Sequence, residues 1–341
     1  MIEILTTGAA NSVQDLGRFG YLDAGVSRSG AMDASALEIA NRMIGNDAGA
    51  AAIEIAVFPF RARFSHSALV AVTGADCPVS LNGNLHPAWW ALPVRSGDVL
   101  ELGLPRSGAR AYLAVAGGIV VENVLGSAAT DLKSGWGGLE GRGLRRGDRL
   151  VFTPHSVPLT ALPAGFGLDP VALGRAASDL AETNPIRVVP GAEHQFFEAS
   201  AATAFETTPW KVTEDANRQG YRLSGTELRL TRKLELHSHG IMPGTVQAPP
   251  SGQPIIQLAE ANTCGGYPKI AHVIEADLWR LGQAPVGSLL RFSLVSRSEA
   301  VAALREQRAR LNRAAAFAAL ARKDARHPEI LSALAGADRS S

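Results

Sequence analysis

The stretch "VSLNGNLH", residues 79–86, carries the clearest secondary-structure signal in the sequence. Asn82 and Gly83 stand between two short runs in which apolar and polar residues alternate. An Asn-Gly pair favours the two-residue turn that joins antiparallel strands, because both central positions of that turn need a positive φ. The stretch therefore predicts a β-hairpin and makes strands the expected elements of the fold.

Strand-like runs lie on both sides of this hairpin. They are β-branched or leucine-rich, and Gly, Pro, Asp or Ser bounds each of them. These runs cover residues 68–75, 98–103, 110–118, 149–153, 186–191 and 289–295. Glycine-containing turns enter the strands in "RSGDVLELG", "RRGDRLVFT" and "PVGSLLRFS", which suits barrel-like sheets. Such turns are common before strands, so the pattern leaves open whether it marks homologous halves.

Helical patterns are few. The clearest covers residues 33–46, where Asp33 can cap the first turn, an apolar stripe follows, and Gly45 can close the last turn. A second pattern begins in the Ala- and Arg-rich segment 298–341. Two interpretations of that segment stay open: a helix packed on its own domain, or a contact with a neighbouring subunit, since Arg308 interrupts the apolar seam.

These patterns divide the chain into three parts. We expect a β-rich domain over residues 1–185, which ends in a Pro-, Gly- and Ala-rich linker at 156–185. A second β domain follows over residues 186–297, and a helical tail covers residues 298–341. The predicted fold class is therefore mainly β with few helices and a C-terminal helical tail.

The composition of the 341-residue chain excludes several classes of function. A net charge of +1 gives no basic field for nucleic acid. The two cysteines, Cys77 and Cys264, imply no disulfide framework. The N-terminus lacks the features of a signal peptide, and the longest apolar run, residues 111–121, is too short to span a bilayer. We expect a cytoplasmic protein without membrane or nucleic-acid partners.

Several common motifs are absent or incomplete. The sequence has neither a phosphate-binding G-x-x-x-x-G-K-[ST] loop nor a G-x-S-x-G elbow. The glycine-rich run "GWGGLEGRG", residues 135–143, lacks the context of a dinucleotide fingerprint and is interpreted as a mobile surface loop. His237 and His239 alone do not make a metal site, so no metal is predicted. Cys264 is interpreted as a small buried thiol.

Four polar, glycine-rich stretches lie outside the regular strands. They cover residues 12–33, 215–225, 238–255 and 260–273. Each combines charged or carboxamide side chains with glycines that let a ligand approach the backbone closely. Rigid loops with convergent donors and acceptors suit a small amide, urea or carboxylate group. We therefore expect these stretches to form the walls of one site.

The same stretches carry a family resemblance. In order, the sequence contains "VQDLGRFGYLDAGVSRSGAMD", "ALEIANRMIGN", "VLGSAATDL", "NRQGYRLSG", "GTVQAPPSGQPI" and "GGYPKIAHVI". Over residues 2–297 the chain resembles the biotin-dependent carboxyltransferase family, which is also called the allophanate hydrolase subunit 2 family. That family includes the C subunit of ATP-dependent 5-oxoprolinase, half of the carboxyltransferase region of urea carboxylase, and an antagonist of a sporulation-kinase inhibitor.

The resemblance implies a fold, a partner and a type of chemistry. It implies cyclophilin-like β-barrel domains and a partner homologous to the B subunit of 5-oxoprolinase, or allophanate hydrolase subunit 1. It implies an enzyme subunit that acts on a small amide, lactam or urea-like substrate. The cofactors it implies are carboxybiotin on a partner chain or ATP used by the assembly, with none bound tightly to this chain. The sequence contains no biotin-attachment A-M-K-M motif.

The resemblance also indicates candidate site residues. As candidate catalytic residues, Arg18 and Arg218 would hold a carboxylate or a polarised carbonyl, Asp15 or Glu260 would accept a proton, and Lys269 would stabilise developing negative charge. The candidate substrate-binding residues are Gln14, Met32, Asp33, Asn217, Tyr221, Gln247, Gln253, Gly265, Gly266 and Tyr267.

The chain departs from the family pattern at three places. Gln219 stands where relatives usually have methionine, residues 238–240 read Ser-His-Gly in place of Ser-Glu-Gly, and residues 260–263 read Glu-Ala-Asn-Thr in place of an acidic-Arg-Gln-Thr run. These departures allow a different amide substrate. They also allow an alternative function, a regulatory protein that binds and antagonises a partner of the B type without catalysis.

Overall fold

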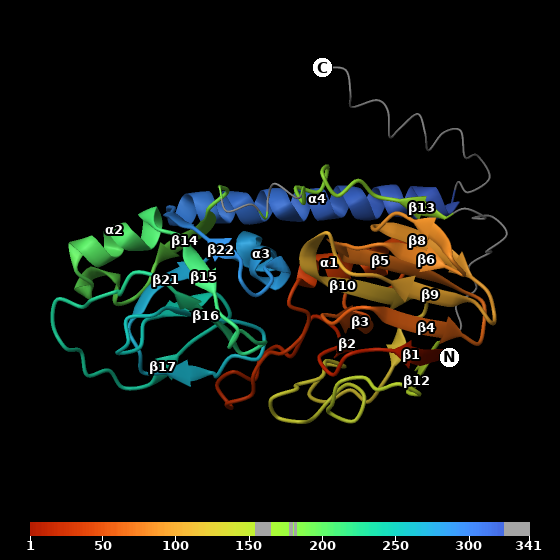
Figure 1. Ribbon diagram of the computed structural model, residues 1–341, viewed down its shortest axis with the longest axis horizontal. Helices are drawn as coiled ribbons and strands as arrows, with labels where there is room; N and C mark the ends of the chain where they lie inside the picture. Colours follow the sequence, from red (N-terminus) through yellow and green to blue (C-terminus); the bar gives the residue numbers. More distant parts are fainter. Residues whose placement is uncertain (154–164, 177–179, 181–182, 324–341) are drawn as a thin grey trace, which may run out of the picture.

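The computed structural model describes residues 1–153, 165–176, 180 and 183–323. Strands dominate these residues and helices are few, which confirms the predicted fold class. Figure 1 shows two β regions side by side, with one long helix lying along both. The first β region holds the strands of residues 2–167, and the second holds the strands of residues 186–294.

The first β region consists of two sheets that share one core. Within the described residues, one sheet has seven strands and the other has six. In spatial order, the larger sheet contains β11 (Ile119–Val120), β12 (Arg149–Phe152), β1 (Ile2–Thr6), β4 (Phe60–Phe64), β9 (Val99–Leu102), β6 (Val79–Leu81) and β7 (Asn84–His86). The smaller sheet contains β13 (Phe166–Gly167), β8 (Trp90–Val94), β5 (Ala68–Asp76), β10 (Ser107–Val115), β3 (Ala52–Ile55) and β2 (Ser12–Gln14).

The predicted hairpin joins two strands of the larger sheet. Strands β6 and β7 pair in antiparallel register, with Leu81 opposite Asn84. Asn82 and Gly83 have φ values of 52° and 85°, the left-handed conformations that this turn needs. Because alternate residues of the strands point between the two sheets, side chains such as Phe60 and Val70 form a single apolar core. The hairpin prediction is confirmed.

Helix α1 (Ala34–Ile44) covers the outer face of the smaller sheet. Its buried side chains Leu37 and Met43 pack with Leu69 of β5. The helix begins as predicted: Asp33 accepts a hydrogen bond from the amide of Ala36 at 3.0 Å. It ends at Gly45, whose φ of 87° is the left-handed conformation of a helix C-cap.

Asp33 also links α1 to distant segments. Its carboxylate accepts two hydrogen bonds of 2.7 Å from Arg175 and one of 2.8 Å from Gln283. Burial alone would raise the pKa of Asp33, but the guanidinium of Arg175 and these hydrogen bonds hold that pKa below its ordinary value. Asp33 is therefore a cap and a buried charge partner at once.

We expect Asp33→Asn to lower the free energy of unfolding at neutral pH by about 1–3 kcal/mol, because it leaves Arg175 without its charge partner but keeps a capping oxygen. The carboxylate of Asp33 contributes fully above the unfolded pKa of about 3.9, and its contribution is lost as the pH falls through the lower folded pKa. The melting temperature of the wild type should therefore fall more steeply in acid than that of the variant. Thermal unfolding at several pH values measures this, and parallel curves would contradict it.

The second β region is an eight-stranded sheet within the described residues, and it almost closes on itself. In spatial order it contains β22 (Leu289–Leu290), β15 (Trp210–Val212), β16 (Gly220–Ser224), β19 (Ile255–Gln257), β18 (Thr245–Gln247), β21 (Lys269–Val273), β14 (Ile186–Pro190) and β23 (Phe292–Leu294). Its interior holds an apolar cluster that includes Trp210, Val246 and Phe292. The predicted barrel is therefore present in this region.

The segment predicted as one strand over residues 289–295 forms two. Leu289 and Leu290 pair with β15, whereas residues 292–294 pair in parallel with β14. The chain changes partner at Arg291, whose guanidinium donates to the carbonyl oxygen of Thr207 at 2.8 Å. The two edges of the sheet are therefore one residue apart, which brings the barrel close to closure.

Short elements surround the barrel. A ribbon of β17 (His239–Gly240) and β20 (Cys264–Gly265) lies beside it. The remaining short elements of this region are helices α2 (Ala199–Thr207) and α3 (Leu278–Gln283) and the 3-10 turns η3 (His194–Phe196) and η4 (Glu275–Asp277). Cys264 on β20 is exposed, so the expected buried thiol is wrong for this residue.

Helix α4 (Arg297–Lys323) contacts both β regions of its own chain (Figure 1). Leu311 and Ala318 pack in the cluster that contains α1, whereas Ala303 packs with Ile274 and Ala276 of the second region. Arg308, which interrupts the apolar seam of this segment, donates to Glu38 of α1 at 3.0 Å. Its charge is therefore paired within the chain. Residues 324–341 of the predicted tail, and parts of the predicted linker at 156–185, lie outside the described residues.

The glycine-rich run at residues 135–143 exposes Gly135 and Glu140, but part of it packs closely against the chain. Gly138 and Gly141 are buried. A Cβ atom at Gly143 would lie 1.8 Å from the carbonyl oxygen of Ala9, and one at Gly138 would lie 1.9 Å from Oγ1 of Thr130. The glycines therefore serve close backbone packing, which the surface-loop interpretation did not anticipate.

Candidate functional site

A buried ion network joins the two β regions. Arg218, just before β16, has only 9% of its side chain exposed. Its guanidinium donates to Glu54 of β3, to Oε1 of Glu260 at 2.5 Å, and to the carbonyl oxygen of Gly30 at 2.6 Å. Three segments that are far apart in the sequence therefore meet at one side chain.

Glu54 is the acidic centre of this network. Tyr112 of β10 is its register partner in the sheet, so both side chains lie on the same face. One carboxylate oxygen of Glu54 accepts hydrogen bonds of 2.8 Å from the hydroxyl of Tyr112 and from the amide of Met32. Arg110 lies two residues earlier on β10, with its Nε 3.7 Å from the other oxygen. Glu54 is therefore the counter-ion of two arginines, Arg218 and Arg110.

Electrostatic interactions within the network shift the pKa values of Arg218 and Tyr112. Burial disfavours the charged form of Arg218, but Glu54 and Glu260 outweigh it and raise the pKa of Arg218. Burial, Glu54 and Asp33 also raise the pKa of Tyr112 well above its ordinary value. The arginine therefore stays charged and the tyrosine stays neutral at physiological pH.

The charged stretch at residues 12–33 packs against the loop of residues 124–136. Asp15 accepts three hydrogen bonds of 2.7 Å, from the amides of Gly17 and Ala128 and from the hydroxyl of Ser127. Arg18 donates to the carbonyl oxygen of Ala129 at 2.5 Å. These polar groups are engaged with the chain itself.

Arg18 lies deep in this packing. Its guanidinium stacks over the ring of Trp136 at 4.4 Å. Burial lowers the pKa of Arg18, and Asp15, Asp131 and Glu260 oppose that shift. Arg18 and Arg218 therefore both lie within electrostatic range of Glu260. Gln14, also buried, donates to Ser12 and to the carbonyl oxygen of Thr130.

Lys269 belongs to a second polar cluster, between the barrel and the β17–β20 ribbon. Its ammonium group donates to the carbonyl oxygen of Gly265 at 3.0 Å and lies 3.3 Å from Nδ1 of His239. The other ring nitrogen of His239 lies 3.7 Å from Glu193. Burial lowers the pKa of Lys269, and Glu193 opposes that shift. We call Lys269, His239, Glu193, Gln247 and Gly265 the lysine cluster.

Gln247 faces Lys269 across paired strands. The two residues are register partners on β18 and β21. The side-chain oxygen of Gln247 accepts a hydrogen bond of 3.0 Å from Gln257, but its buried Nε2 has no hydrogen-bond partner. A Cβ atom at Gly265 would lie 2.6 Å from that nitrogen, so glycine lets the ribbon approach. His239 is 43% exposed in its side chain, which leaves the rim of the lysine cluster open to solvent.

The other predicted site residues are spread over the second β region and its junction. Tyr221 is buried and accepts a hydrogen bond of 2.9 Å from Arg110. Met32 packs in the barrel core. Asn217 caps a turn by accepting hydrogen bonds from the amides of Gln219 and Gly220.

Three predicted residues lie further out. Gln253 bonds to both backbone groups of Gly225 at the surface. Tyr267 is 47% exposed, and Gly266 lies next to it. The structure thus brings Arg18, Arg218 and Glu260 together, and it places Lys269 with Gln247 and Gly265 in the other cluster.

Sequence reasoning missed Glu54, Arg110, Tyr112 and Glu193. The signal for Glu54 was present, since it is the one charged residue in the apolar run "AAIEIAV", residues 51–57. A charge inside a buried strand needs a partner of opposite charge. The sequence could not name that partner, because Arg218 lies 164 residues away.

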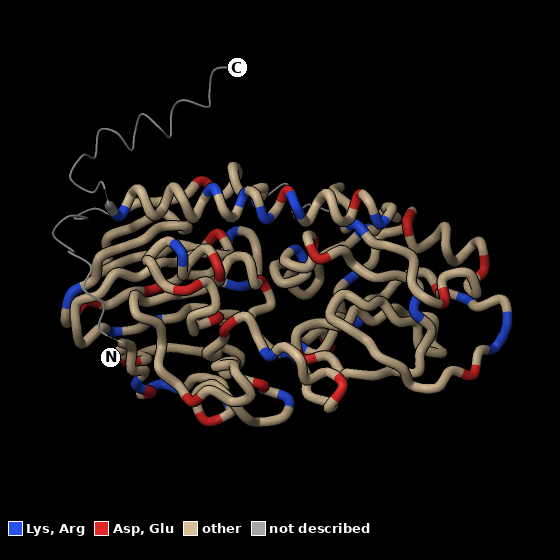
Figure 2. The backbone as a smooth tube through the Cα atoms, turned by 180° about the vertical axis from the view of Figure 1, so that it is seen from behind, with Lys and Arg blue, Asp and Glu red and all other residues tan. Residues whose placement is uncertain are grey.

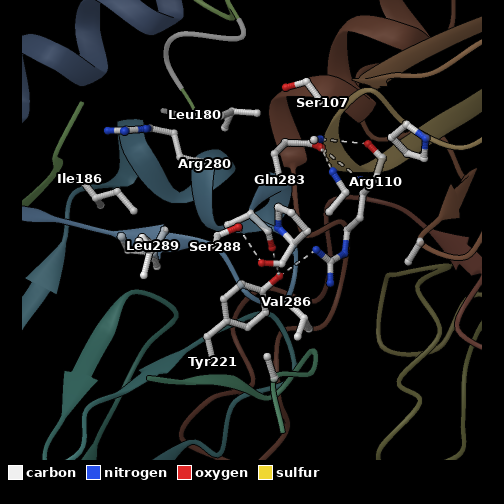
Figure 3. Close-up of a pocket in the computed structure, with 18 of the residues that line it drawn as sticks. Ser107, Arg110, Leu180, Ile186, Tyr221, Arg280, Gln283, Val286, Ser288 and Leu289 are labelled. Carbon is white, nitrogen blue, oxygen red and sulfur yellow. Dashed lines mark hydrogen bonds between the residues drawn. The ribbon is translucent and has the colours of Figure 1, made fainter. Parts of the chain in front are cut away.

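Two neighbouring cavities open between the β regions. One, of about 390 Å³, is lined by Glu54, Arg218 and Glu260 of the ion network. The other, of about 640 Å³, is lined by residues that include Arg110 and Tyr221 (Figure 3). Arg110 lines both cavities, so they meet at the ion network.

The distribution of charge is mixed. Figure 2 shows acidic and basic positions interspersed along both halves of the chain. Among the described residues, no group of three or more His, Cys, Asp or Glu side chains is arranged to hold a metal ion. None of the helices in the described part of the chain has the length and apolar character to cross a membrane.

Comparison with known proteins places the chain in a family. Residues 24–294 match the family model described as carboxyltransferase domain, subdomain A and B. The chain is 43% identical over 307 residues to the C subunit of 5-oxoprolinase from Escherichia coli (strain K12), covering 90% of this chain and 95% of that protein. It is 39% identical over 300 residues to the C subunit of 5-oxoprolinase from Haemophilus influenzae, covering 88% and 93%.

A solved structure extends this likeness to the fold. The crystal structure of the K. lactis urea amidolyase superposes with a TM-score of 0.80 at 30% identity. The match covers 92% of this chain but only 20% of the much longer urea amidolyase chain. The chain therefore belongs to the carboxyltransferase-domain family, subdomains A and B, in which it is a homologue of the C subunit of 5-oxoprolinase.

Proposed function

We propose that this chain is the C-type subunit of a 5-oxoprolinase and that the lysine cluster forms its part of the active site. The observation that carries the proposal is the 43% identity to the C subunit of the Escherichia coli 5-oxoprolinase over 95% of that protein. A protein of this type works with other subunits, so partner chains would complete the site and bind the ATP that the assembly uses.

The lysine cluster has groups suited to opening a lactam. Attack of water on the ring carbonyl places negative charge on the carbonyl oxygen and releases a proton from the water. Collapse of that tetrahedral intermediate then breaks the C–N bond, and the leaving nitrogen takes up a proton. Lys269 and the unpartnered Nε2 of Gln247 are donors for that oxygen. His239, near Glu193, can exchange protons at the open rim.

The ion network is better suited to positioning the loops than to catalysing a reaction. The guanidinium of Arg218 donates to two carboxylates and a carbonyl oxygen, all within the chain. Glu260 in turn also accepts from the amides of Leu132 and Lys133. Groups whose hydrogen bonds are already made lose those bonds if they turn to a substrate. We therefore assign Arg218 and Glu260, and with them Arg18 and Asp15, to positioning the loops.

Carboxyl transfer is the second candidate. The family description and the likeness to urea amidolyase favour it. The amide nitrogen of Gln247 and the ammonium of Lys269 would suit a urea-type carbonyl equally well, and any biotin would come from another chain. The chain corresponds to only a fifth of the urea amidolyase, however, so this likeness says less about the whole activity than the match to the 5-oxoprolinase protein.

The test is an assay of the reconstituted assembly. The chain is co-expressed with the partner subunits encoded beside it, and ATP hydrolysis is measured with and without 5-oxoproline. We expect hydrolysis that depends on 5-oxoproline and on the presence of this chain. Carboxylation of a urea without a response to 5-oxoproline would favour carboxyl transfer instead. Tight partner binding without turnover of either substrate would favour a regulatory role.

A further inference from the structure

A groove lies where the charged stretch of residues 12–33 meets helices α1, α3 and α4. Figure 1 shows α1 and α3 next to each other below α4, where the two β regions meet. The groove has a volume of about 330 Å³, and all the residues that line it belong to the described part of the chain. No residue of the lysine cluster is among them.

Arg28 brings an unpaired positive charge to this groove. Its side chain is half-buried, and its guanidinium stacks over the ring of Phe19 at 4.1 Å. No described residue forms a hydrogen bond or an ion pair with that guanidinium. Burial lowers the pKa of Arg28; Glu275 opposes that shift and Arg308 adds to it. The charge of Arg28 is therefore partly removed from water without a carboxylate bonded to it.

The next residue, Ser29, adds an unused hydrogen-bonding group. Ser29 lines the groove and is only 3% exposed, and its Oγ has no hydrogen-bond partner among the described residues. Its φ of 52° is uncommon for a residue other than glycine, and its amide donates to the carbonyl oxygen of Ala259 at 2.8 Å. A strained backbone and an unmet hydrogen bond at one residue are typical of a ligand site.

Two carboxylates also line the groove, and only one of them is paired. Glu38 of α1 lies 2.9 Å from Arg42 and 3.0 Å from Arg308. Glu275, at the start of η4, is exposed and forms no hydrogen bond or ion pair through its side chain with any described residue. It lies within electrostatic range of Arg28, but the two side chains are not bonded to each other. The groove therefore holds one free cation and one free anion.

The rest of the lining is mainly apolar. Gln307 of α4 donates to the carbonyl oxygen of Ala276 at 3.0 Å, which fixes α4 against η4 along the groove. Phe19 is 61% exposed, so this wall offers apolar area that a ligand can cover. The large apolar side chains of the wall are Leu16, Phe19, Leu258, Leu278 and Leu311.

We propose that this groove binds an α-amino acid with an apolar side chain. Its carboxylate accepts hydrogen bonds from the guanidinium of Arg28 and the hydroxyl of Ser29, its ammonium group faces Glu275, and its side chain covers the apolar wall. An α-amino acid carries its two charges close together, which suits two opposite charges of the protein that are near but not in contact. The volume of about 330 Å³ is in the range of small-molecule sites.

The test measures equilibrium binding to the full chain by calorimetry. The probes are L-leucine, L-methionine and L-phenylalanine. The controls are 4-methylpentanoate, which is leucine without its amine, 3-methylbutylamine, which is leucine without its carboxylate, and glycine, which has no side chain. We expect at least one probe to bind and the controls to bind at least tenfold more weakly, because each lacks a charge or the apolar contact. No binding of any probe, or equal binding of 4-methylpentanoate or 3-methylbutylamine, would overturn the proposal.

Variants of the two free charges locate the site. Arg28→Gln and Glu275→Gln should each weaken amino-acid binding by roughly tenfold, and Arg28→Lys should keep part of the affinity. Arg232→Gln is the matched control, since Arg232 also stacks over a phenylalanine, Phe196, but lies outside the groove. Full affinity in both Arg28→Gln and Glu275→Gln would refute the site. Circular dichroism and the melting temperature verify that each variant is folded.

Ser29→Ala gives a readout of binding apart from stability. The hydroxyl has no partner within the described chain, so its removal should leave the melting temperature unchanged or higher and still weaken amino-acid binding. A lower melting temperature with unchanged affinity would show that Ser29 is structural and would contradict its assigned role.

A final variant separates this groove from the proposed active site. Lys269→Met should leave the amino-acid affinity unchanged, because Lys269 does not line the groove. Affinity lost in Lys269→Met but kept in Arg28→Gln and Glu275→Gln would place the amino acid in the lysine cluster and refute the separate site. Failure of the assembly to turn over 5-oxoproline would refute the proposed function and leave this binding result untouched.

Discussion

Replacing Arg218 by methionine is expected to lower the free energy of unfolding by about 3–5 kcal/mol. The substitution keeps an apolar side chain of similar length but removes the charge. It leaves Glu54, whose side chain is 1% exposed, with only the more distant Arg110, and it leaves Glu260, which is 2% exposed, without its hydrogen-bonded cation. A buried carboxylate without a partner is costly, and that cost exceeds the loss of the hydrogen bonds alone. Urea denaturation followed by fluorescence measures the change.

Two further variants make this expectation specific. Arg61→Met removes an exposed arginine that is paired with Glu101, and it should change stability by about 0–1 kcal/mol. The double variant Arg218→Met with Glu260→Gln should be less destabilised than the sum of the single variants, because the second change removes a charge that the first one left unpaired. A wild-type denaturation midpoint for Arg218→Met would show that the network does not hold the junction.

The reason for such a large effect is the topology of the junction. Glu54 belongs to the first β region, Arg218 and Glu260 belong to the second, and Gly30 belongs to the charged stretch of residues 12–33. Loss of Arg218 therefore weakens the contact between the two β regions and not only the surroundings of one side chain. Helix α4 lies across both regions and should keep them together in the variant.

Local chemistry made much of the fold predictable. Asn82 and Gly83 adopt the positive φ values that their sequence favours, and Asp33 and Gly45 begin and end α1 where the pattern predicts. These features depend on neighbouring residues only, so a single sequence contains the information. The break at Arg291 was not predictable, because the two halves of that segment pair with different strands.

The site was less predictable, because its contacts are distant in the sequence. The polar loops do carry buried, interacting charges. The spacing of these residues in the sequence does not show which of them lie together in space. Asp15 and Arg18 turn toward the loop of residues 124–136, and Lys269 pairs with a strand that ends in Gln247. Whether any of these residues acts on a substrate stays a prediction, and the next variant tests it.

Lys269→Met is expected to reduce kcat/KM of the reconstituted assembly for 5-oxoproline by roughly 10²–10³-fold, the usual effect of removing one donor to a developing oxyanion. The fold should survive, because Lys269 lies at the rim of the barrel and methionine can follow the course of its aliphatic stem. Gln247→Leu is the companion variant, and it should also lower kcat more than it raises KM. Unchanged kcat in both variants would remove the lysine cluster from the reaction.

The pH dependence shows whether Lys269 acts as a cation or as a base. Burial places its pKa below the ordinary lysine value of 10.5, so the ammonium form is lost at a lower pH than usual. If the cation stabilises the oxyanion, kcat/KM must fall as the pH rises through this lowered pKa. Lys269→Arg should then retain part of the activity and shift the alkaline limb upward, because a guanidinium stays charged. A lysine that acts as a neutral base gives the opposite slope, and arginine cannot replace it.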